Sequence, residues 1–207
     1  MPLIDPLSSA SQTLTSAGLI SSILPPFQPS ALLTVLLPSG AAALGAEVAL
    51  SETVEPPGIA VAAAPTEADV TAAGLVKNET RYTLAMLDPD APSGANPTSR
   101  SFLHWVVTGL MPADDLAAAA THPERKANDP QYRGPGPWKG SGVHRYTFAL
   151  FREPPNFSLP DDAPERMNGC APDDPVPRRP WSVAAFLERN PELELVGATF
   201  YLIRAEE

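Results

Sequence analysis

Cysteine is almost absent from this chain. Cys170 is the only one among 207 residues, so no internal disulfide can form. Positive charge is also scarce, because 14 lysines and arginines stand against 24 acidic residues, a formal charge of −10. That balance disfavours nucleic acid and anionic membrane surfaces as partners, since both select basic proteins.

Long apolar runs are missing as well. No run approaches the roughly 20 residues that a membrane helix needs. The N-terminus also lacks the basic start and hydrophobic core of a secretory signal. We therefore expect a soluble, cytoplasmic protein, monomeric and with one substantial core.

Proline, by contrast, is abundant and points to a β-rich fold. The chain has 26 prolines, where a typical share of ~5% would give about ten. They fall in short clusters between apolar runs, as in domains with many turns. We expect strands at residues 31–37, 47–50, 59–63, 81–87, 102–108, 143–151 and 193–203. Helices are expected at residues 9–24, ended by Pro25-Pro26, and at 114–121 and 181–189, with a long surface loop at 152–179.

This order of elements predicts a mainly β protein, a β-sandwich with a few peripheral helices. Residues 1–26 would form an N-terminal helical extension, and residues 27–207 a single domain.

The most informative segment, residues 134–151, reads GPGPWKGSGVHRYTFALF. Four glycines and two prolines fill its first nine positions, and backbone amides in such a loop can converge on an anion. In the strand that follows, alternate residues share a face, so His144 and Tyr146 point the same way. The segment suits a phosphate or carboxylate pocket. A wide hairpin loop beside a core histidine explains the pattern equally well.

An acidic turn, Asp88-Pro89-Asp90, is the second candidate. Pro89 restricts the conformation of Asp88, and two carboxylates near a histidine would favour its protonated, anion-binding form. Taken alone, the pair also suits a turn that caps backbone amides. His104 is similarly ambiguous: with Phe102, Val106 and Thr108 on its face of a strand, it could equally be a core residue.

Together these motifs resemble one known family. DPDAPS at residues 88–93, HW at 104–105 and GPGPxKGSGxHRY at 134–146 occur in the order seen in phosphatidylethanolamine-binding proteins, also called Raf-kinase-inhibitor-like proteins. FQPSALLTV and LERNPELELVGATFY, near the two ends, are most similar to the branch that contains the carboxypeptidase Y inhibitor. The resemblance implies a large central sheet, a smaller sheet packed on it and a few helices at the edge.

The resemblance also implies a binding pocket without catalytic residues, metal or cofactor. Its positions correspond here to Asp88, Asp90, Pro92, His104, Gly134, Gly136, Pro137, His144 and Tyr146. The loop amides and both histidines would hold a phosphate-like group. The aspartate pair would orient the histidines and could face an ammonium group.

Three departures from the family pattern concern the ligand. Gly94 stands where a basic residue often follows DPDAPS, and Trp138 replaces the second proline of the usual GPPxG. The chain stops at Glu207, soon after the last expected strand, without the extra helix of longer family members. The anion site is kept in this interpretation, whereas the preference for a phospholipid headgroup stays open.

Other chemistries fit less well. Ser93 and Ser141 lie near Asp88 and His144 in the sequence, but neither sits in the G-x-S-x-G turn of a hydrolase nucleophile. The two histidines and two aspartates are suitable metal ligands without a metal-binding spacing. Arg133, Arg145 and Trp138 are too few to form a nucleic-acid face on so acidic a chain.

The resemblance implies two functions, and they are compatible. The pocket residues favour a protein that binds a phosphate-like anion or a phosphoethanolamine headgroup. The N-terminal extension and Trp138 favour a regulator that inhibits a serine carboxypeptidase or a kinase. The sequence does not decide between a lipid, a peptidase and a kinase as the target.

Overall fold

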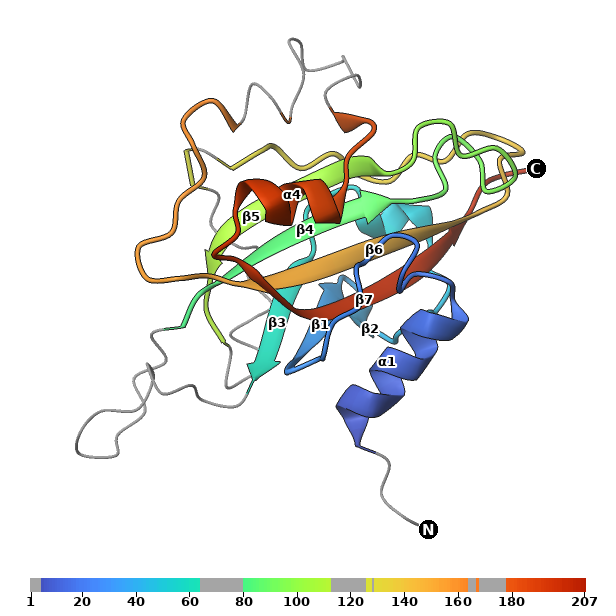
Figure 1. Ribbon diagram of the computed structural model, residues 1–207. Helices are drawn as coiled ribbons and strands as arrows, with labels where there is room; N and C mark the ends of the chain where they lie inside the picture. Colours follow the sequence, from blue (N-terminus) through green and yellow to red (C-terminus); the bar gives the residue numbers. More distant parts are fainter. Residues whose placement is uncertain (1–4, 64–79, 113–125, 128, 164–166, 168–177) are drawn as a thin grey trace.

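Two antiparallel sheets form the fold (Figure 1). The computed structural model describes residues 5–63, 80–112, 126–127, 129–163, 167 and 178–207. The larger sheet has the order β5-β4-β6-β7, with β4 at Tyr82–Asp88, β5 at Phe102–Leu110, β6 at Val143–Arg152 and β7 at Glu194–Arg204. The smaller has the order β2-β1-β3, with β1 at Ala31–Leu37, β2 at Gly40–Ala42 and β3 at Gly58–Ala63. The expected mainly β sandwich is confirmed.

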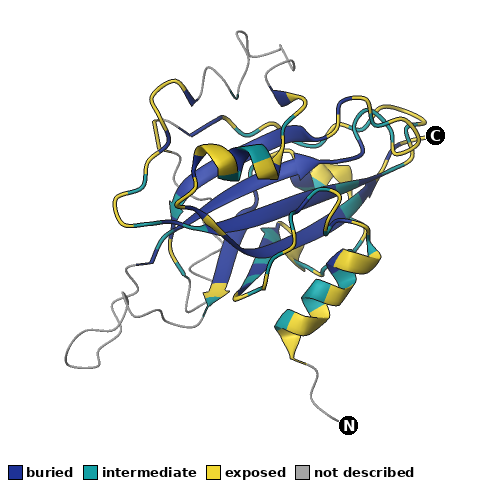
Figure 2. Ribbon diagram, viewed as in Figure 1, coloured by how far each residue is buried: buried dark blue, intermediate teal, exposed yellow. Residues whose placement is uncertain are grey.

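Each face of the larger sheet carries its own hydrophobic core. Leu84 and Met86 of β4 pack between the sheets, with residues of β1 and β3. Ala85 and Leu87 point to the other face, where the N-terminal segment and helix α4 (Val183–Arg189) cover them. Because both faces are covered, every residue of β4 is buried (Figure 2), which explains why the run YTLAML is apolar except for Thr83.

The first helix differs from the expectation at both ends. Helix α1 spans Pro6–Ser16, where residues 9–24 were expected. It begins early because the Asp5 carboxylate accepts the Ser8 amide at 3.0 Å, an N-cap that spacing alone did not reveal. It ends early because Gly18 takes a left-handed conformation, φ +67°, and turns the chain away.

The N-terminal segment is packed onto the sheet. Leu14, Leu19 and Leu24 are each at most 1% exposed and lie in the second core with Phe200. The turn at Gly18 brings the last two of these leucines back towards the sheet. Residues 14–24 therefore contribute to the same core as the strands.

Strand β5 contains an irregularity that matters for the site. The register passes from Met86↔Trp105 to Leu87↔Leu103, so His104 is an extra residue opposite β4. The simple alternation expected for residues 102–108 is therefore wrong. Leu103 and Val106 share one core, whereas Trp105 and Val107 share the other.

Two further expectations need correction. The strand expected at residues 47–50 is a single bridge, Glu47↔Leu202, followed by a short 3-10 helix, η1 (Leu50–Thr53). Within the loop expected at 152–179, Arg178 is 5% exposed and its guanidinium donates to backbone carbonyls, so this end is not a surface loop. The helix expected at 114–121 lies outside the described residues. Among those described, no helix is long and apolar enough to cross a membrane.

Candidate functional site: an anion-sized pocket at the strand ends

The candidate residues converge where three strands meet. Strand β4 runs antiparallel to both β5 and β6, so its last residue, Asp88, lies beside the starts of these strands. The register pairs Asp88 with Phe102 and Leu87 with Thr147. His104 and His144 come from these two neighbouring strands, which is how residues far apart in sequence reach one pocket.

A hydrogen-bonded chain joins Asp88, His144 and Ser141. The Asp88 Oδ2 atom lies 2.7 Å from His144 Nδ1, and His144 Nε2 lies 2.9 Å from Ser141 Oγ. Asp88 and His144 are both nearly inaccessible, at 3% and 2% exposed. The hydrogen bond between them fixes the orientation of the His144 imidazole. Asp88 therefore orients a histidine, as the resemblance implied for the aspartate pair.

His104 has a different environment. Its Nδ1 atom lies 2.7 Å from the Arg133 carbonyl oxygen. Because a carbonyl only accepts, Nδ1 carries the proton, and Nε2 of the neutral ring is a hydrogen-bond acceptor. Burial lowers the pKa of His104 to about 4, against the opposing charge of Asp88. Nearby carboxylates therefore do not hold His104 in its protonated form, because desolvation outweighs their attraction.

Tyr146 lies against both histidine rings. Its ring is stacked on His144 at 6.2 Å and meets the edge of His104 at 5.1 Å. The side chain is buried, and burial together with the charge of Asp88 raises the pKa of its hydroxyl. Tyr146 therefore remains a neutral hydroxyl, and it lies on the same side of β6 as His144, as the alternation predicted.

The loop before β6 is held at its N-terminal end by two hydrogen bonds. The Arg133 amide donates to the His104 carbonyl at 2.8 Å, and the Tyr132 hydroxyl donates to the Thr53 carbonyl at 2.7 Å. Gly134 is required here, since an added Cβ would lie 2.9 Å from the Thr53 carbonyl oxygen. At Gly136 nothing lies within 4 Å of such a Cβ.

These groups enclose a cavity of about 270 Å³. The size suits a headgroup or a small anion, since drug-sized ligands occupy pockets of about 300 Å³ and more. Eight of the nine expected residues line it: Asp88, Pro92, His104, Gly134, Gly136, Pro137, His144 and Tyr146. The lining also includes Ala91, Ser99, Phe102, Arg133, Trp138 and Arg179.

Asp90 is the exception among the expected residues. Its carboxylate accepts the Arg145 guanidinium at 2.6 and 2.8 Å and the Arg145 amide at 2.9 Å. Arg145 in turn donates to the Ala17 carbonyl at 2.6 Å, at the end of α1. The expectation that Asp90 orients a histidine is therefore wrong, because the aspartate pair divides: Asp88 faces the pocket and Asp90 links β6 to the N-terminal segment.

Comparison with known proteins places the chain in a family. Residues 31–200 match the family described as phosphatidylethanolamine-binding protein. The chain belongs to this family.

Two solved structures show that the similarity in fold spans nearly the whole chain. One is a carboxypeptidase Y inhibitor, in complex with its cognate proteinase: the TM-score is 0.70 at 22% identity, over 99% of this chain and 98% of that one. The other is a phosphatidylethanolamine-binding protein from Plasmodium vivax, with a TM-score of 0.69 at 20% identity, over 94% of this chain and 97% of that one.

Sequence relatives match over a shorter part of the chain. Protein BROTHER of FT and TFL 1 of Arabidopsis thaliana is 40% identical over 72 residues, 35% of this chain and 36% of that protein. Protein MOTHER of FT and TFL1 homolog 2 of Oryza sativa subsp. japonica is 38% identical over 76 residues, 37% of this chain and 38% of that protein. The matched region thus covers less than two fifths of either relative.

Several residues of this family member's pocket were not identified from sequence. Ser99, Phe102 and Arg179 line it, and Arg133 lies over the Phe102 ring at 5.8 Å. Arg179 lies 35 positions after His144 and has no motif of its own, so only the folded chain brings it to the pocket. Phe102 could have been identified, because it precedes His104 by two positions at the start of the same strand.

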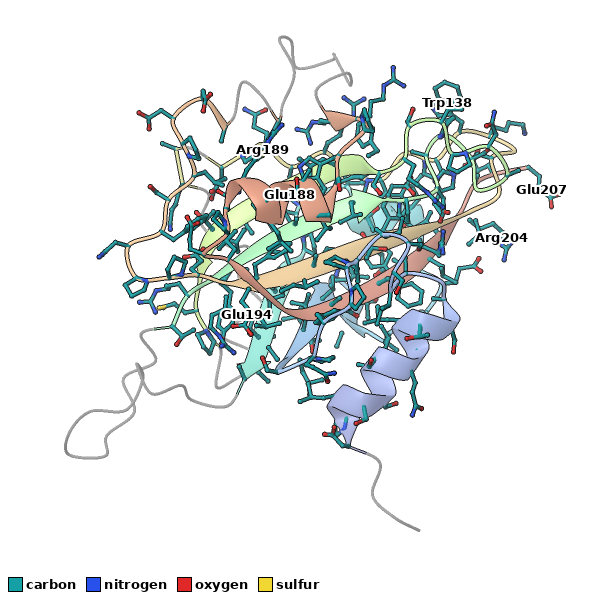
Figure 3. All side chains as sticks on the ribbon, in the orientation of Figure 1. Trp138, Glu188, Arg189, Glu194, Arg204 and Glu207 are labelled. Atoms are coloured by element: carbon teal, nitrogen blue, oxygen red, sulfur yellow. The ribbon has the colours of Figure 1, made fainter. Side chains whose placement is uncertain are left out.

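Trp138 and Ser93 have clear surroundings. Trp138 is 74% exposed while lining the pocket, and it lies at the end of the molecule that carries Glu207 (Figure 3). The Ser93 hydroxyl accepts the Asn96 amide at 3.2 Å, a turn contact. No group of three or more histidine, cysteine or acidic side chains suited to a metal ion occurs among the residues described.

Proposed function

We propose that this chain is a non-catalytic binding protein whose pocket takes a phosphate-like anion, such as a phosphorylated headgroup. The observation that carries the proposal is the pocket itself: two histidines, Tyr146 and the glycine loop around about 270 Å³ at the ends of β4, β5 and β6. Membership of the phosphatidylethanolamine-binding protein family supports it.

The donors around the pocket suit an anion. Tyr146 is a neutral hydroxyl, and Arg133 and Arg179 line the wall. His144 is oriented by Asp88, and the Ser141 hydroxyl at its Nε2 can rotate when a ligand arrives. Hydrogen bonds from such donors to a charged ligand are stronger than neutral ones.

The test is calorimetric titration with inorganic phosphate. His144→Ala should weaken binding by about 1–3 kcal/mol, the usual range for a hydrogen bond to a charged group. Thr15→Ala, on the exposed face of α1, is the matched control and should bind as the wild type does. Absence of phosphate binding at millimolar concentration, or equal binding by His144→Ala, would contradict the proposal.

The proposed absence of catalysis has its own support. Ser141, His144 and Asp88 are arranged like a nucleophile, base and acid, but an acyl-transfer site also needs free amides for the oxyanion. The Gly140 amide donates to the Glu206 carbonyl at 2.7 Å, and the Ser141 amide donates to the Trp138 carbonyl at 2.9 Å. The Ser141 amide and the Gly140 amide before it are thus already used.

A fluorophosphonate probe tests this point directly. We expect no adduct on Ser141 by intact-mass measurement. An adduct that forms at a rate comparable to that of a serine hydrolase, and disappears in Ser141→Ala, would overturn the non-catalytic interpretation.

A second candidate function is inhibition of a serine carboxypeptidase. The 74% exposed Trp138 beside the pocket favours it, as does the likeness to a carboxypeptidase Y inhibitor over 99% of the chain. Deleting residues 1–26 is a poor test, since it would uncover the core that Leu14, Leu19 and Leu24 fill. Carboxypeptidase Y inhibition should instead be compared for Trp138→Ala and for Thr15→Arg on the exposed face of α1. Absence of inhibition by the wild type would remove this candidate.

A further inference from the structure

Two arginines lie in the pocket wall without an acidic partner among the described residues. Arg179 Nη1 donates to the Ser99 hydroxyl at 3.0 Å, and the Arg133 guanidinium lies over the Phe102 ring. Both side chains are exposed and both line the cavity. Two other arginines, Arg152 and Arg204, are paired with Glu194 and Glu47.

The carboxylates near the pocket are already occupied. Asp88, the one acidic residue among the described lining residues, contacts the His144 ring and accepts the Asp90 amide at 2.8 Å. Asp90 forms a bidentate hydrogen-bonded ion pair with Arg145 and does not line the cavity. An ammonium group entering the pocket would therefore meet two guanidinium groups and no free carboxylate.

We propose that the pocket selects a phosphomonoester without an ammonium group over phosphoethanolamine, and that Arg133 and Arg179 are the residues that set this preference. The inference rests on the proposed anion-binding function and deepens it. Each arginine attracts the phosphoryl charge, and each repels a cationic substituent attached to it.

Ethyl phosphate and O-phosphorylethanolamine are the matched probes. They share the phosphoryl group and the two-carbon chain, and they differ in the ammonium. We expect calorimetry at pH 7.5 to give ethyl phosphate about five- to tenfold the affinity of O-phosphorylethanolamine, as two partly screened charges would produce.

Charge-removing variants assign the preference to the arginines. Arg133→Gln and Arg179→Gln together should weaken ethyl phosphate binding and bring the ratio of the two affinities close to one. Arg189→Gln is the matched control. It removes the same charge from the exposed face of α4 and should leave the ratio unchanged (Figure 3). Thermal unfolding of each variant confirms that the fold is retained.

The outcomes separate this inference from the function on which it rests. If O-phosphorylethanolamine binds as tightly as ethyl phosphate or more tightly, the selectivity is refuted while the anion site stands. A preference that survives the double substitution refutes the role of the arginines. If neither probe binds, the anion-binding function fails and the selectivity with it.

Discussion

At the residue scale, the two pocket histidines are distinguished by what their Nδ1 atoms contact. His144 Nδ1 faces the Asp88 carboxylate, whereas His104 Nδ1 faces the Arg133 carbonyl. A carboxylate can stabilise a charged imidazole, but a single carbonyl does not offset full burial. The pocket thus contains the His144 imidazole beside the Asp88 carboxylate and the neutral imidazole of His104.

This difference predicts a pH effect on stability. The pKa of His104 is about 4 in the folded chain, below its ordinary value of 6.5. The unfolded state therefore binds the proton more readily, and stability falls as the pH falls from about 6.5 towards 4. When the pH falls from 7.5 to 5.5, the burial of neutral His104 should lower the free energy of unfolding by roughly 1–1.5 kcal/mol.

Urea denaturation of wild type and His104→Asn at these two pH values measures this cost. Asparagine keeps a donor for the Arg133 carbonyl but cannot take up the proton. The wild type should lose roughly 1–1.5 kcal/mol more than the variant, as the linkage requires. Equal losses in the two proteins would show that His104 is not held neutral by burial.

At the element scale, the glycine loop depends on one close approach. Gly134→Ala would place a Cβ 2.9 Å from the Thr53 carbonyl oxygen, so the loop or η1 must move. We expect a loss of about 1–3 kcal/mol in the free energy of unfolding, as for other overpacked sites. Gly136→Ala meets nothing within 4 Å and should change stability by less than about 0.5 kcal/mol. Thermal unfolding that gives the two variants the same stability would contradict this account of the loop.

The N-terminal segment is the second element with a clear energetic consequence. Leu19 is fully buried in the second core. Leu19→Ala should therefore lower the free energy of unfolding by about 2–5 kcal/mol. Ser16→Ala, at an exposed position in the same segment, should have little effect. A loss below about 0.5 kcal/mol at Leu19, read from urea denaturation, would mean that the segment does not dock on the sheet.

The regular elements could be predicted from sequence, and the irregular ones could not. Short apolar, β-prone runs located β1, β4 and β6: β1 alternates between buried and half-buried side chains, every residue of β4 is buried, and most residues of β6 are buried. Period-two alternation failed at His104, where a bulge adds a residue without a sequence signal. The rule for helix ends likewise predicted that the first helix would continue to Pro25-Pro26. In the structure, Gly18 ends α1, only nine residues after the expected start at Ser9.

Most of the pocket could also be predicted from the sequence. The motifs located eight of the lining residues because each motif ends or begins a strand at the same edge of the sheet. They misplaced Asp90, since spacing does not tell which way a side chain leaves a turn. They also missed Arg179, which reaches the pocket only through the fold of residues distant in sequence.

At the scale of the whole molecule, an acidic protein carries its pocket at one end of a doubly covered sheet. The chain has a formal charge of −10, yet two arginines and two histidines line the cavity. The net negative charge of the rest of the chain would repel anions, so the proposed anion binding would be restricted to this end. A headgroup reaching the pocket would be recognised singly, without adsorption of the protein to an anionic bilayer.

Histidine side-chain NMR tests the central claim most directly. The chain has only three histidines, so the ring nitrogen spectrum of a 15N-labelled sample can be assigned by substitution. Titration with inorganic phosphate should shift the ring signals of His104 and His144 together, along one saturating curve. In Asp88→Asn, half-saturation of the same shifts should require a higher phosphate concentration. Ring signals of both histidines that stay unchanged at tens of millimolar phosphate would contradict the proposal that this pocket is an anion site.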